Sequence, residues 1–344
     1  MSKILIIRFS ALGDVAMTIP VIYSLANANP AHEITVLSRE PFRVLFKSLP
    51  TNVRFIGAEL KGKHNGIKGL NVLYKELKEE QFDFVADFHS VLRSHYLCLR
   101  FKLDGVSTAS IDKGRKEKKK LTQKQSKTFV QLKSSFDRYY EVLEKLGFSF
   151  DLNFVSVFEK GGDLSAIISQ TGYKSSEKWL GIAPFAKHRG KIYPLELQEK
   201  VIAHFANDKR IKVFIFGGGE SERNTVNSWV EKYPSVLSMV GKLNMGQELV
   251  LMSQLDAMFS MDSANMHLAS LVNTQVVSLW GATHPFAGFM GWNQTVENTI
   301  QGEISCRPCS IYGQKPCYRG DYACLYQITP EQIINRIENL LFDL

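Results

Sequence analysis

The sequence predicts an α/β protein with two doubly wound parallel sheets. Short, strongly apolar runs alternate with helix-like segments through the first half, and the same alternation begins again after a mixed stretch at 151–177. The chain has 344 residues, which is enough for about two domains. Parallel strands need helical crossovers, so this alternation is typical of sheets covered by helices on both faces.

The first half contains four strand-like runs with helices between them. Its opening, Lys3 to Pro20, is a strand, a tight turn and the start of a helix, which is the first half of a βαβ unit. The expected strands are 4–7, 34–37, 53–56 and 82–88, and the expected helices run on from Asp14 or cover 42–49, 67–80, 91–101 and 129–146.

The second half repeats the pattern after Gly161-Gly162, where we place a domain boundary between residues 160 and 161. The expected domains are therefore 1–160 and 161–328, followed by a closing segment, 329–344, in which Thr329 and Pro330 mark a helix start. The expected strands are 179–183, 213–216, 257–260 and 276–280, and the expected helices are 195–206, 221–231, 245–253, 265–271 and 330–344.

The composition is that of a globular protein, with 44% hydrophobic and 22% charged residues. No apolar run approaches the ~20 residues of a membrane span, and the N-terminus lacks a signal-peptide layout. We therefore expect a cytoplasmic protein without a transmembrane segment. Residues 1–150 hold 25 Lys and Arg against 15 Asp and Glu, whereas the remainder holds 17 against 19.

Much of the positive excess lies in the basic run Lys113 to Lys127, which carries eight Lys or Arg and one Glu. One interpretation is a solvated, mobile loop, as most charge runs are. The other is a contact for an anionic partner: nucleic acid, an acidic membrane surface or a phosphorylated glycolipid. Nucleic acid is the least supported, because no binding motif is present and few aromatic residues interleave with the lysines.

The turn at Ala11-Leu12-Gly13 places Asp14 at the start of a helix. Gly13 tolerates backbone shapes that a side chain would forbid. A carboxylate at a helix N-terminus tends to stay ionised, so Asp14 could act as a base near neutral pH. The alternative, favoured by spacing alone, is that Asp14 only caps the helix.

A second candidate site is the stretch Met261 to Ser270, which follows an expected strand and leads into a helix. The N–H groups of residues 263 to 266 would form an anion site suited to phosphate, and Ser263 could add a hydroxyl donor. His267 lies one turn inside the helix and is expected to be a packed helix residue rather than a catalyst.

Two further loops follow strands in the second half. The loop 184–194 carries Lys187, His188, Arg189 and Lys191, which could neutralise a pyrophosphate or form a basic surface loop. Phe216 to Glu222 has the character of a turn near a nucleotide, without a GxGxxG pattern or a Walker lysine. The sequence also has no D-x-D pair to hold a metal-bound diphosphate. These features fit a metal-free transferase.

Four cysteines lie close together near the end of the chain, and Cys98 stands apart. Cys306, Cys309, Cys317 and Cys324 follow the spacing C-x2-C-x7-C-x6-C. In a cytosolic chain such a cluster suggests a structural zinc site, although these spacings fit no standard zinc finger. The alternative is that free or paired thiols hold a loop rich in Gly and Pro.

Together these stretches resemble the ADP-heptose:lipopolysaccharide heptosyltransferase family, the family 9 glycosyltransferases. The opening RFSALGDVAMTIP and the later MDSANMHLASLVNTQVVSLWGATHP carry the resemblance, and they are specific in combination. FDFVADFHSVLRS, DKGRKE and GKIYP add weaker similarity, and CRPC with Cys317 and Cys324 is similar to a cysteine-rich tail found in part of the family. Ala264 and Asn265 stand where the family usually has Gly and a small residue or Pro.

The resemblance implies a GT-B architecture: two Rossmann-like domains with a cleft between them. The first domain would bind the acceptor and the second the nucleotide sugar, and the helix in 329–344 would pack back on the N-terminal domain. It also implies an inverting, metal-independent transfer that needs no cofactor beyond the donor, which we expect to be ADP-heptose. The acceptor would be a lipopolysaccharide core or another anionic glycolipid, met by an enzyme peripheral on the cytoplasmic face of the inner membrane.

The resemblance also assigns roles to residues of this chain. Asp14 would be the base, and Lys191 would stabilise the departing diphosphate with the amides of residues 263 to 266. Asp262 would bind hydroxyls of the donor sugar, and Glu222, or else Glu220, would lie near the nucleoside. The expected donor-binding set is Gly13, Gly217, Gly218, Glu222, Asp262, Ser263, Ala264, Asn265, Met266 and His267. The expected acceptor-binding set is Arg8, Ser10, His89, Arg93, Arg115 and Lys116.

Two other functions remain open from sequence. A nucleotide-sugar epimerase or hydrolase on the same fold would need further acid and base carboxylates, and the sequence offers no convincing pair. A non-catalytic protein that binds a sugar nucleotide would have no need of both Asp14 and Lys191.

Overall fold

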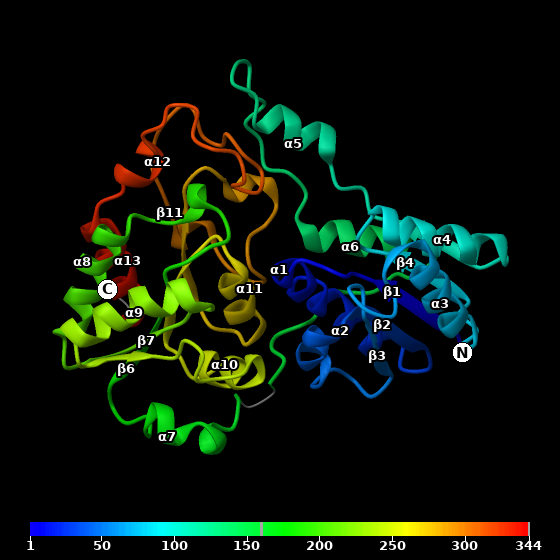
Figure 1. Ribbon diagram of the computed structural model, residues 1–344, viewed down its shortest axis with the longest axis horizontal. Helices are drawn as coiled ribbons and strands as arrows, with labels where there is room; N and C mark the ends of the chain where they lie inside the picture. The colour runs from blue at the N-terminus through cyan, green and yellow to red at the C-terminus, as the bar shows by residue number, and fades with distance from the viewer. Residues whose placement is uncertain (159–160, 343–344) are drawn as a thin grey trace. The chain divides into compact units, whose positions relative to one another are not determined.

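The computed structural model describes residues 1–158 and 161–342, and the chain divides into two compact units (Figure 1). The first unit comprises Met1–Arg115 and Lys133–Val157, and the second comprises Lys116–Leu132 and Phe158–Leu344. The boundary expected between residues 160 and 161 adjoins residues 159–160, which lie outside the described part. The chain passes to the second unit after Val157, and residues 116–132 also belong to that unit.

The first unit is built on a five-stranded parallel sheet with the order β3-β2-β1-β4-β5. The chain winds outward from β1 to β3, then returns to β4 on the other side of β1. This reversal confirms the doubly wound class, and it creates a switch point at the carboxyl ends of β1 and β4, where α/β proteins bind ligands. The strands are β1 (Lys3–Ile7), β2 (Glu33–Arg39), β3 (Val53–Ala58), β4 (Phe84–Asp87) and β5 (Ser107–Ser110).

The helices of the first unit follow the expected order with shifted ends. The helix expected to run on from Asp14 is interrupted near Thr18, because Pro20 has no N–H to continue the ladder. Residues 129–134 are not helical, and the last helix of this unit begins after the Ser134 cap. The α-helices are α1 (Leu12–Ala16), α2 (Ile19–Ala28), α3 (Gly66–Lys78), α4 (Leu92–Leu103) and α6 (Ser135–Glu144), and η1 (Glu40–Phe46) is a 3-10 helix.

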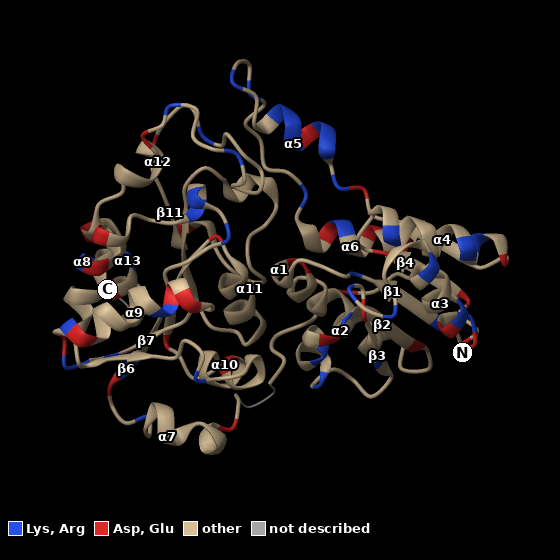
Figure 2. Cartoon of the chain, viewed as in Figure 1, with Lys and Arg blue, Asp and Glu red and all other residues tan. Residues whose placement is uncertain are grey.

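The basic run is in part an ordered helix, α5 (Arg115–Leu121), which is mostly Lys and Arg (Figure 2). Lys118 is buried with its ammonium 4.3 Å from the ring centroid of Phe289. Leu121 is fully buried beside Leu132 and Ala287. A freely mobile loop is therefore the wrong interpretation of this segment, because part of it packs into the second unit.

The second unit holds a six-stranded parallel sheet with the order β11-β10-β9-β6-β7-β8. Its switch point lies between β6 and β9, from which the chain winds outward in opposite directions. The strands are β6 (Lys178–Ala183), β7 (Ile211–Ile215), β8 (Val236–Ser238), β9 (Ala257–Met261), β10 (Val276–Trp280) and β11 (Thr299–Gln301).

Helices cover both faces of this sheet, as the alternation of apolar segments predicts. The α-helices are α7 (Ile168–Thr171), α8 (Leu195–Ala206), α9 (Glu220–Lys232), α10 (Met245–Met252), α11 (Ala264–Leu271), α12 (Ala323–Tyr326) and α13 (Pro330–Phe342). Short 3-10 turns are η2 (Leu164–Ala166), η3 (Arg189–Lys191), η4 (Pro285–Ala287) and η5 (Val296–Asn298).

The closing helix α13 packs in the core of the second unit, which corrects the expectation that it packs on the N-terminal domain. Its residues Ile333, Ile337 and Leu341 recur every four positions and are buried. They belong to the apolar cluster that packs against the sheet of the second unit, and α13 contacts α8, β9 and β10. One apolar stripe can face only one core, and here it faces the sheet of its own unit.

Within residues 1–158 and 161–342, no helix has both the length and the apolar character needed to cross a bilayer.

Candidate active site

In the first unit, Arg8 and Asp14 form an ion pair at the carboxyl end of β1. Arg8 follows the strand, and its Nη2 lies 2.8 Å from Oδ1 of Asp14, while Nη1 donates to the carbonyl of Phe88 at 2.7 Å. Only 7% of Arg8 is exposed, whereas the Asp14 side chain is 30% exposed. Asp14 is therefore held by a buried cation and remains accessible to a ligand.

Asp14 also stabilises the start of α1, although it is not the N-cap residue. The N-cap is Ala11, whose N–H donates to Oδ2 of Asp14 at 3.0 Å. The Tyr139 hydroxyl donates to the Asp14 carbonyl at 3.2 Å and fixes the backbone. The carboxylate thus has one oxygen on the N-cap N–H of α1 and the other on the Arg8 guanidinium, and these two contacts fix its orientation.

His89 lies at the neighbouring strand end, after β4, in a turn organised by Asp87. The buried Asp87 accepts hydrogen bonds from the N–H groups of His89 and Ser90, at 2.9 and 2.8 Å. The N–H of Phe9 donates to Nδ1 of His89 at 3.3 Å. This contact assigns the ring proton to Nε2 when the imidazole is neutral.

Burial, followed by the charges of Arg8 and Lys113, lowers the pKa of His89 to about 3. His89 is therefore neutral near pH 7 and can donate one hydrogen bond from Nε2.

Lys113 belongs to the same electrostatic neighbourhood, although the sequence reasoning did not place it in the site. It is half-buried, and its pKa is lowered by burial and by Arg8 and Arg115, against the opposing charges of Asp87 and Asp14. The sequence feature that could have identified Lys113 is its position in the DKGRKE segment. Arg8, Asp14 and Lys113 therefore form the charged centre of this unit, with the neutral His89 beside them.

The other expected acceptor residues lie around this centre or outside it. Ser10 is partly exposed, and Arg93 and Arg115 are exposed, although Arg93 influences His89 and Arg115 influences Lys113 electrostatically. Lys116 is exposed on α5 and belongs to the second unit.

In the second unit, Lys191 and Asp262 form an ion pair at the switch point of the sheet. Asp262 follows β9, Lys191 lies in η3 after β6, and Nζ lies 2.8 Å from Oδ2. The Thr283 hydroxyl donates to the same oxygen at 2.7 Å. The lysine side chain is 16% exposed and the aspartate 5%. The pair is thus desolvated and fixed, and the ammonium retains an exposed portion.

Gly313 determines the path of the Lys191 side chain. Its φ is +77°, and a Cβ at this position would lie 2.7 Å from Cγ of Lys191 and 3.1 Å from Cδ and Cε. The loop of Lys191 is also joined to the loop after β10, because Ala282 donates its N–H to the carbonyl of Gly190 at 2.8 Å. Two loops far apart in sequence therefore position the ammonium.

The N-terminus of α11 begins directly after Asp262. Ser263 is the N-cap in extended conformation, and its side chain makes no capping hydrogen bond, with Oγ 3.3 Å from Oγ of Ser260. The first N–H groups of a helix have no partner within it, so those of Ala264, Asn265 and Met266 suit an anion. Ser263, Ala264 and Asn265 are partly exposed, whereas Met266 and His267 are buried, which fits a packing role for those two side chains.

Glu222 lies in the first turn of α9, after the glycines that follow β7. Its Oε2 accepts a hydrogen bond from Gly218 at 2.7 Å. A Cβ on Gly217 would lie 3.1 Å from that oxygen, so the turn is closely fitted to the carboxylate. Gly218 and Glu220 are exposed, and Gly217 and Glu222 are partly exposed.

Comparison with known proteins decides the family. The family model for glycosyltransferase family 9 (heptosyltransferase) matches residues 71–316. The chain belongs to glycosyltransferase family 9. It is similar to the lipopolysaccharide core heptosyltransferase OpsX of Haemophilus influenzae, at 26% identity over 292 residues, which are 81% of this chain and 79% of that protein.

Solved structures of similar fold cover the chain almost completely. A family 9 glycosyl transferase from Veillonella parvula has 21% identity and a TM-score of 0.76, covering 100% of this chain and 98% of its own. The E. coli heptosyltransferase WaaC with ADP has 17% identity and a TM-score of 0.70, covering 98% of this chain and 99% of its own. These likenesses confirm the GT-B class, and family membership makes the protein a glycosyltransferase.

Arg307 holds the loop that follows β10, and no motif in the sequence pointed to it. Its guanidinium is buried and donates five hydrogen bonds at 2.6–3.1 Å. The acceptors include the carbonyls of Trp280, Gly281 and Thr283, in the loop whose Thr283 contacts Asp262. Burial lowers the pKa of Arg307 to about 10, so it remains charged at pH 7.

The four clustered cysteines are free thiols, and Cys306, Cys309 and Cys324 influence Arg307 electrostatically. No group of three or more His, Cys, Asp or Glu in the described part of the chain could hold a metal ion, so the structural zinc hypothesis is unsupported. Burial raises the pKa of the Cys309 thiol and raises that of Cys324 to about 12.

The backbone of this segment has a structural role instead. Cys309 donates its N–H to Ala282 at 3.1 Å, and the Lys127 ammonium donates to the carbonyls of Ser305, Cys306 and Arg307. The alternative in which thiols sit in a structural loop therefore agrees with the contacts.

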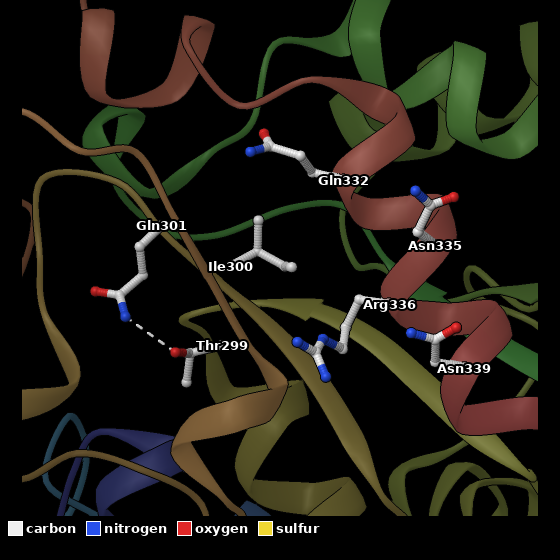
Figure 3. A pocket seen from close by; sticks show the side chains of 7 residues that line it. All are labelled: Thr299, Ile300, Gln301, Gln332, Asn335, Arg336 and Asn339. Atoms are coloured by element: carbon white, nitrogen blue, oxygen red, sulfur yellow. Dashed lines mark hydrogen bonds between the residues drawn. The ribbon is translucent and has the colours of Figure 1, made fainter. Parts of the chain in front are cut away.

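A cavity of about 290 Å³ lies between β11 and α13 (Figure 3). Four amide side chains and one arginine contribute to its wall, and none belongs to the expected site. One of them, Gln301, accepts a hydrogen bond from Arg307 at 3.1 Å. The lining residues are Thr299, Ile300, Gln301, Gln332, Asn335, Arg336 and Asn339.

Proposed function

We propose that this family 9 enzyme transfers a heptose from ADP-heptose to a sugar hydroxyl of a lipopolysaccharide-core acceptor, with inversion at the anomeric carbon and without a metal. The observation that carries the proposal is the Lys191–Asp262 pair beside the N-terminus of α11. A cation and a helix N-terminus together suit a diphosphate leaving group. The names of OpsX and of WaaC with ADP support the choice of sugar and base.

On the acceptor side, Asp14 takes the hydroxyl proton as that oxygen attacks the anomeric carbon. The bond from the acceptor oxygen to the sugar forms, the bond from the sugar to the diphosphate breaks, and ADP leaves with the electron pair. Arg8 orients the carboxylate, and neutral His89 donates from Nε2 to an acceptor oxygen. Lys113, with the exposed Arg93 and Arg115, attracts an acidic acceptor.

On the donor side, the Lys191 ammonium and the amides at the start of α11 stabilise the charge that develops on the diphosphate. Asp262 fixes the ammonium through Oδ2, and we assign its other oxygen to hydroxyls of the donor sugar. Ser263 adds a hydroxyl donor. Glu222 and the turn at Gly217-Gly218 bound the nucleoside.

We also propose that the enzyme works at the cytoplasmic face of the inner membrane, as a peripheral protein. The exposed lysines Lys116, Lys119 and Lys120 of α5 supply positive charge for an anionic glycolipid or for the surface that contains it.

Calorimetric titration with ADP, UDP and GDP, with and without magnesium, tests the donor assignment. We expect ADP to bind most tightly and magnesium to change nothing. Lys191→Met should weaken ADP binding at least ~10-fold, since a desolvated charge-assisted contact contributes about 1.5–3 kcal/mol. Lys209→Met, at an exposed lysine in the turn before β7, is the matched control and should bind normally. Tighter binding of UDP or GDP would overturn the choice of base, and unchanged ADP binding by Lys191→Met would overturn the phosphate site.

A further inference from the structure

Helix α4 carries an exposed apolar stripe. Leu92, Leu99 and Leu103 are 88%, 57% and 75% exposed, and Tyr96 between them is partly exposed. At about 100° per residue these four side chains fall within about 60° of one another around the helix axis. Single exposed leucines are common, but three in one stripe form a patch.

The opposite side of α4 already packs in the core of the first unit. Ser94, Leu97, Cys98 and Phe101 are buried there. The leucine stripe is therefore surplus to the core, and it lies on a helix that is anchored in place. A stripe held on a fixed helix can meet a flat apolar partner without a cost in ordering the chain.

Helix α4 contains lysine and arginine but no acidic residue (Figure 2). By helical position, the cations Arg93 and Arg100 lie to one side of the leucine stripe, whereas the cation Lys102 lies to the other. The Arg100 guanidinium is further held by the Asn71 side chain and stacks 4.2 Å from the ring centroid of Tyr74. This pattern of an apolar centre with cationic borders matches an anionic bilayer surface.

We propose that α4 is the membrane-docking surface of this enzyme, lying along an anionic bilayer with its leucines among the acyl chains near the headgroups. The helix begins three residues after His89, so docking would hold the acceptor-binding centre near the surface. The inference rests on the proposed function only in that the acceptor carries a lipid.

A second copy of the chain is a poorer occupant of this stripe. Pairing two α4 helices would bring like charges together on both borders. The face is also small: 12 residues give a length of about 18 Å and a width of about 10 Å, far below the ~800 Å² per partner of a stable interface.

Flotation with vesicles of phosphatidylcholine, alone or mixed with phosphatidylglycerol, tests the proposal. We expect the wild-type protein to float with the mixed vesicles and to bind phosphatidylcholine alone at least ~10-fold more weakly. The variant that replaces Leu92, Leu99 and Leu103 with Gln, called the α4 variant below, should bind the mixed vesicles at least ~10-fold more weakly, because it removes the apolar contact. Arg93→Gln with Lys102→Gln should weaken binding by about fivefold per cation at low salt.

A matched triple variant controls for the loss of exposed apolar surface in general. Its three positions are exposed in the second unit, and we expect it to float like the wild type. Flotation of the α4 variant at the wild-type level, or no flotation of the wild type, would overturn the proposal. A concentration-dependent dimer that the α4 variant abolishes in sedimentation would assign the stripe to self-association instead. The control substitutions are Tyr173→Gln, Val296→Gln and Tyr326→Gln.

Transfer to a water-soluble, delipidated acceptor separates this inference from the proposed function. The α4 variant should transfer to that acceptor at the wild-type rate, since no stripe residue contacts the charged centre. If the wild type floats but transfers nothing, the proposed function fails and the docking surface stands.

Discussion

Replacing Gly313 with alanine should displace the side chain of Lys191 while every charged group of the protein remains present. The new Cβ would lie 2.7 Å from Cγ of Lys191, whereas ordinary contacts begin at about 3.4 Å, so the lysine chain must move by several tenths of an ångström or more. That shift acts directly on the 2.8 Å contact between Nζ and Oδ2 of Asp262. Misplacement of a transition-state group by about 1 Å costs up to ~10²-fold in rate.

Gly320 provides a matched control for this experiment. Its φ of +80° is close to the +77° of Gly313, but a Cβ there would meet nothing within 4 Å. Both substitutions should lose about 1 kcal/mol of unfolding free energy from left-handed backbone strain, as measured by urea denaturation. Only Gly313→Ala should lower kcat/KM for heptosyl transfer, by ~10- to 100-fold. Equal activity of the two variants would refute the role assigned to the Lys191 geometry.

Two further predictions concern titratable side chains in the second unit. Burial raises the pKa of Glu248 to about 7, so the folded state favours the protonated carboxyl; that stabilisation is complete below pH about 4.5 and is lost as the pH rises through 7. The free energy of unfolding of Glu248→Gln should equal that of the wild type at pH 4 and exceed it by up to about 3 kcal/mol at pH 8. If the difference between the two proteins does not grow over this pH range, the raised pKa of Glu248 is wrong. Arg307→Lys can satisfy at most three of the five acceptors, so it should lose about 3 kcal/mol in urea denaturation and raise KM for the donor. A stable variant with a normal KM would show that this arginine does not support the donor loop.

The strands that the sequence missed are all at the edges of their sheets. β5, β8 and β11 have only three or four residues each, which is too short for a strand pattern to be read, and edge strands are commonly kept short. The central strands are continuous apolar runs, and their pattern was readable for that reason. For α13 the stripe was visible but its partner was not, since periodicity identifies a face and does not say which core that face meets.

The candidate site was predictable where a functional residue lies in the connection that leaves the carboxyl end of a central strand. Asp262 directly follows β9, whereas Asp14 lies seven residues after β1 and Lys191 lies eight residues after β6. Arg307 and Thr283 were missed because their contacts come from distant segments brought together by folding. The ion pair between Lys191 and Asp262 could likewise not be predicted from the sequence, because spacing along the chain does not encode a contact between two loops.

Heptosyl transfer from ADP-heptose to a lipopolysaccharide-core acceptor, measured in EDTA for the wild type, Asp14→Asn and Asp137→Asn, tests whether Asp14 acts as the base of a metal-free transfer. Asp137 occupies the same position in α6 as Asp14 in α1, with Oδ2 accepting the N-cap N–H at 3.0 Å in each, so both variants change the same helix contact. We expect full transfer by the wild type and by Asp137→Asn, and a loss of at least ~10²-fold by Asp14→Asn with ADP binding unchanged. Wild-type transfer that stops in EDTA, or full transfer by Asp14→Asn, would contradict this mechanism.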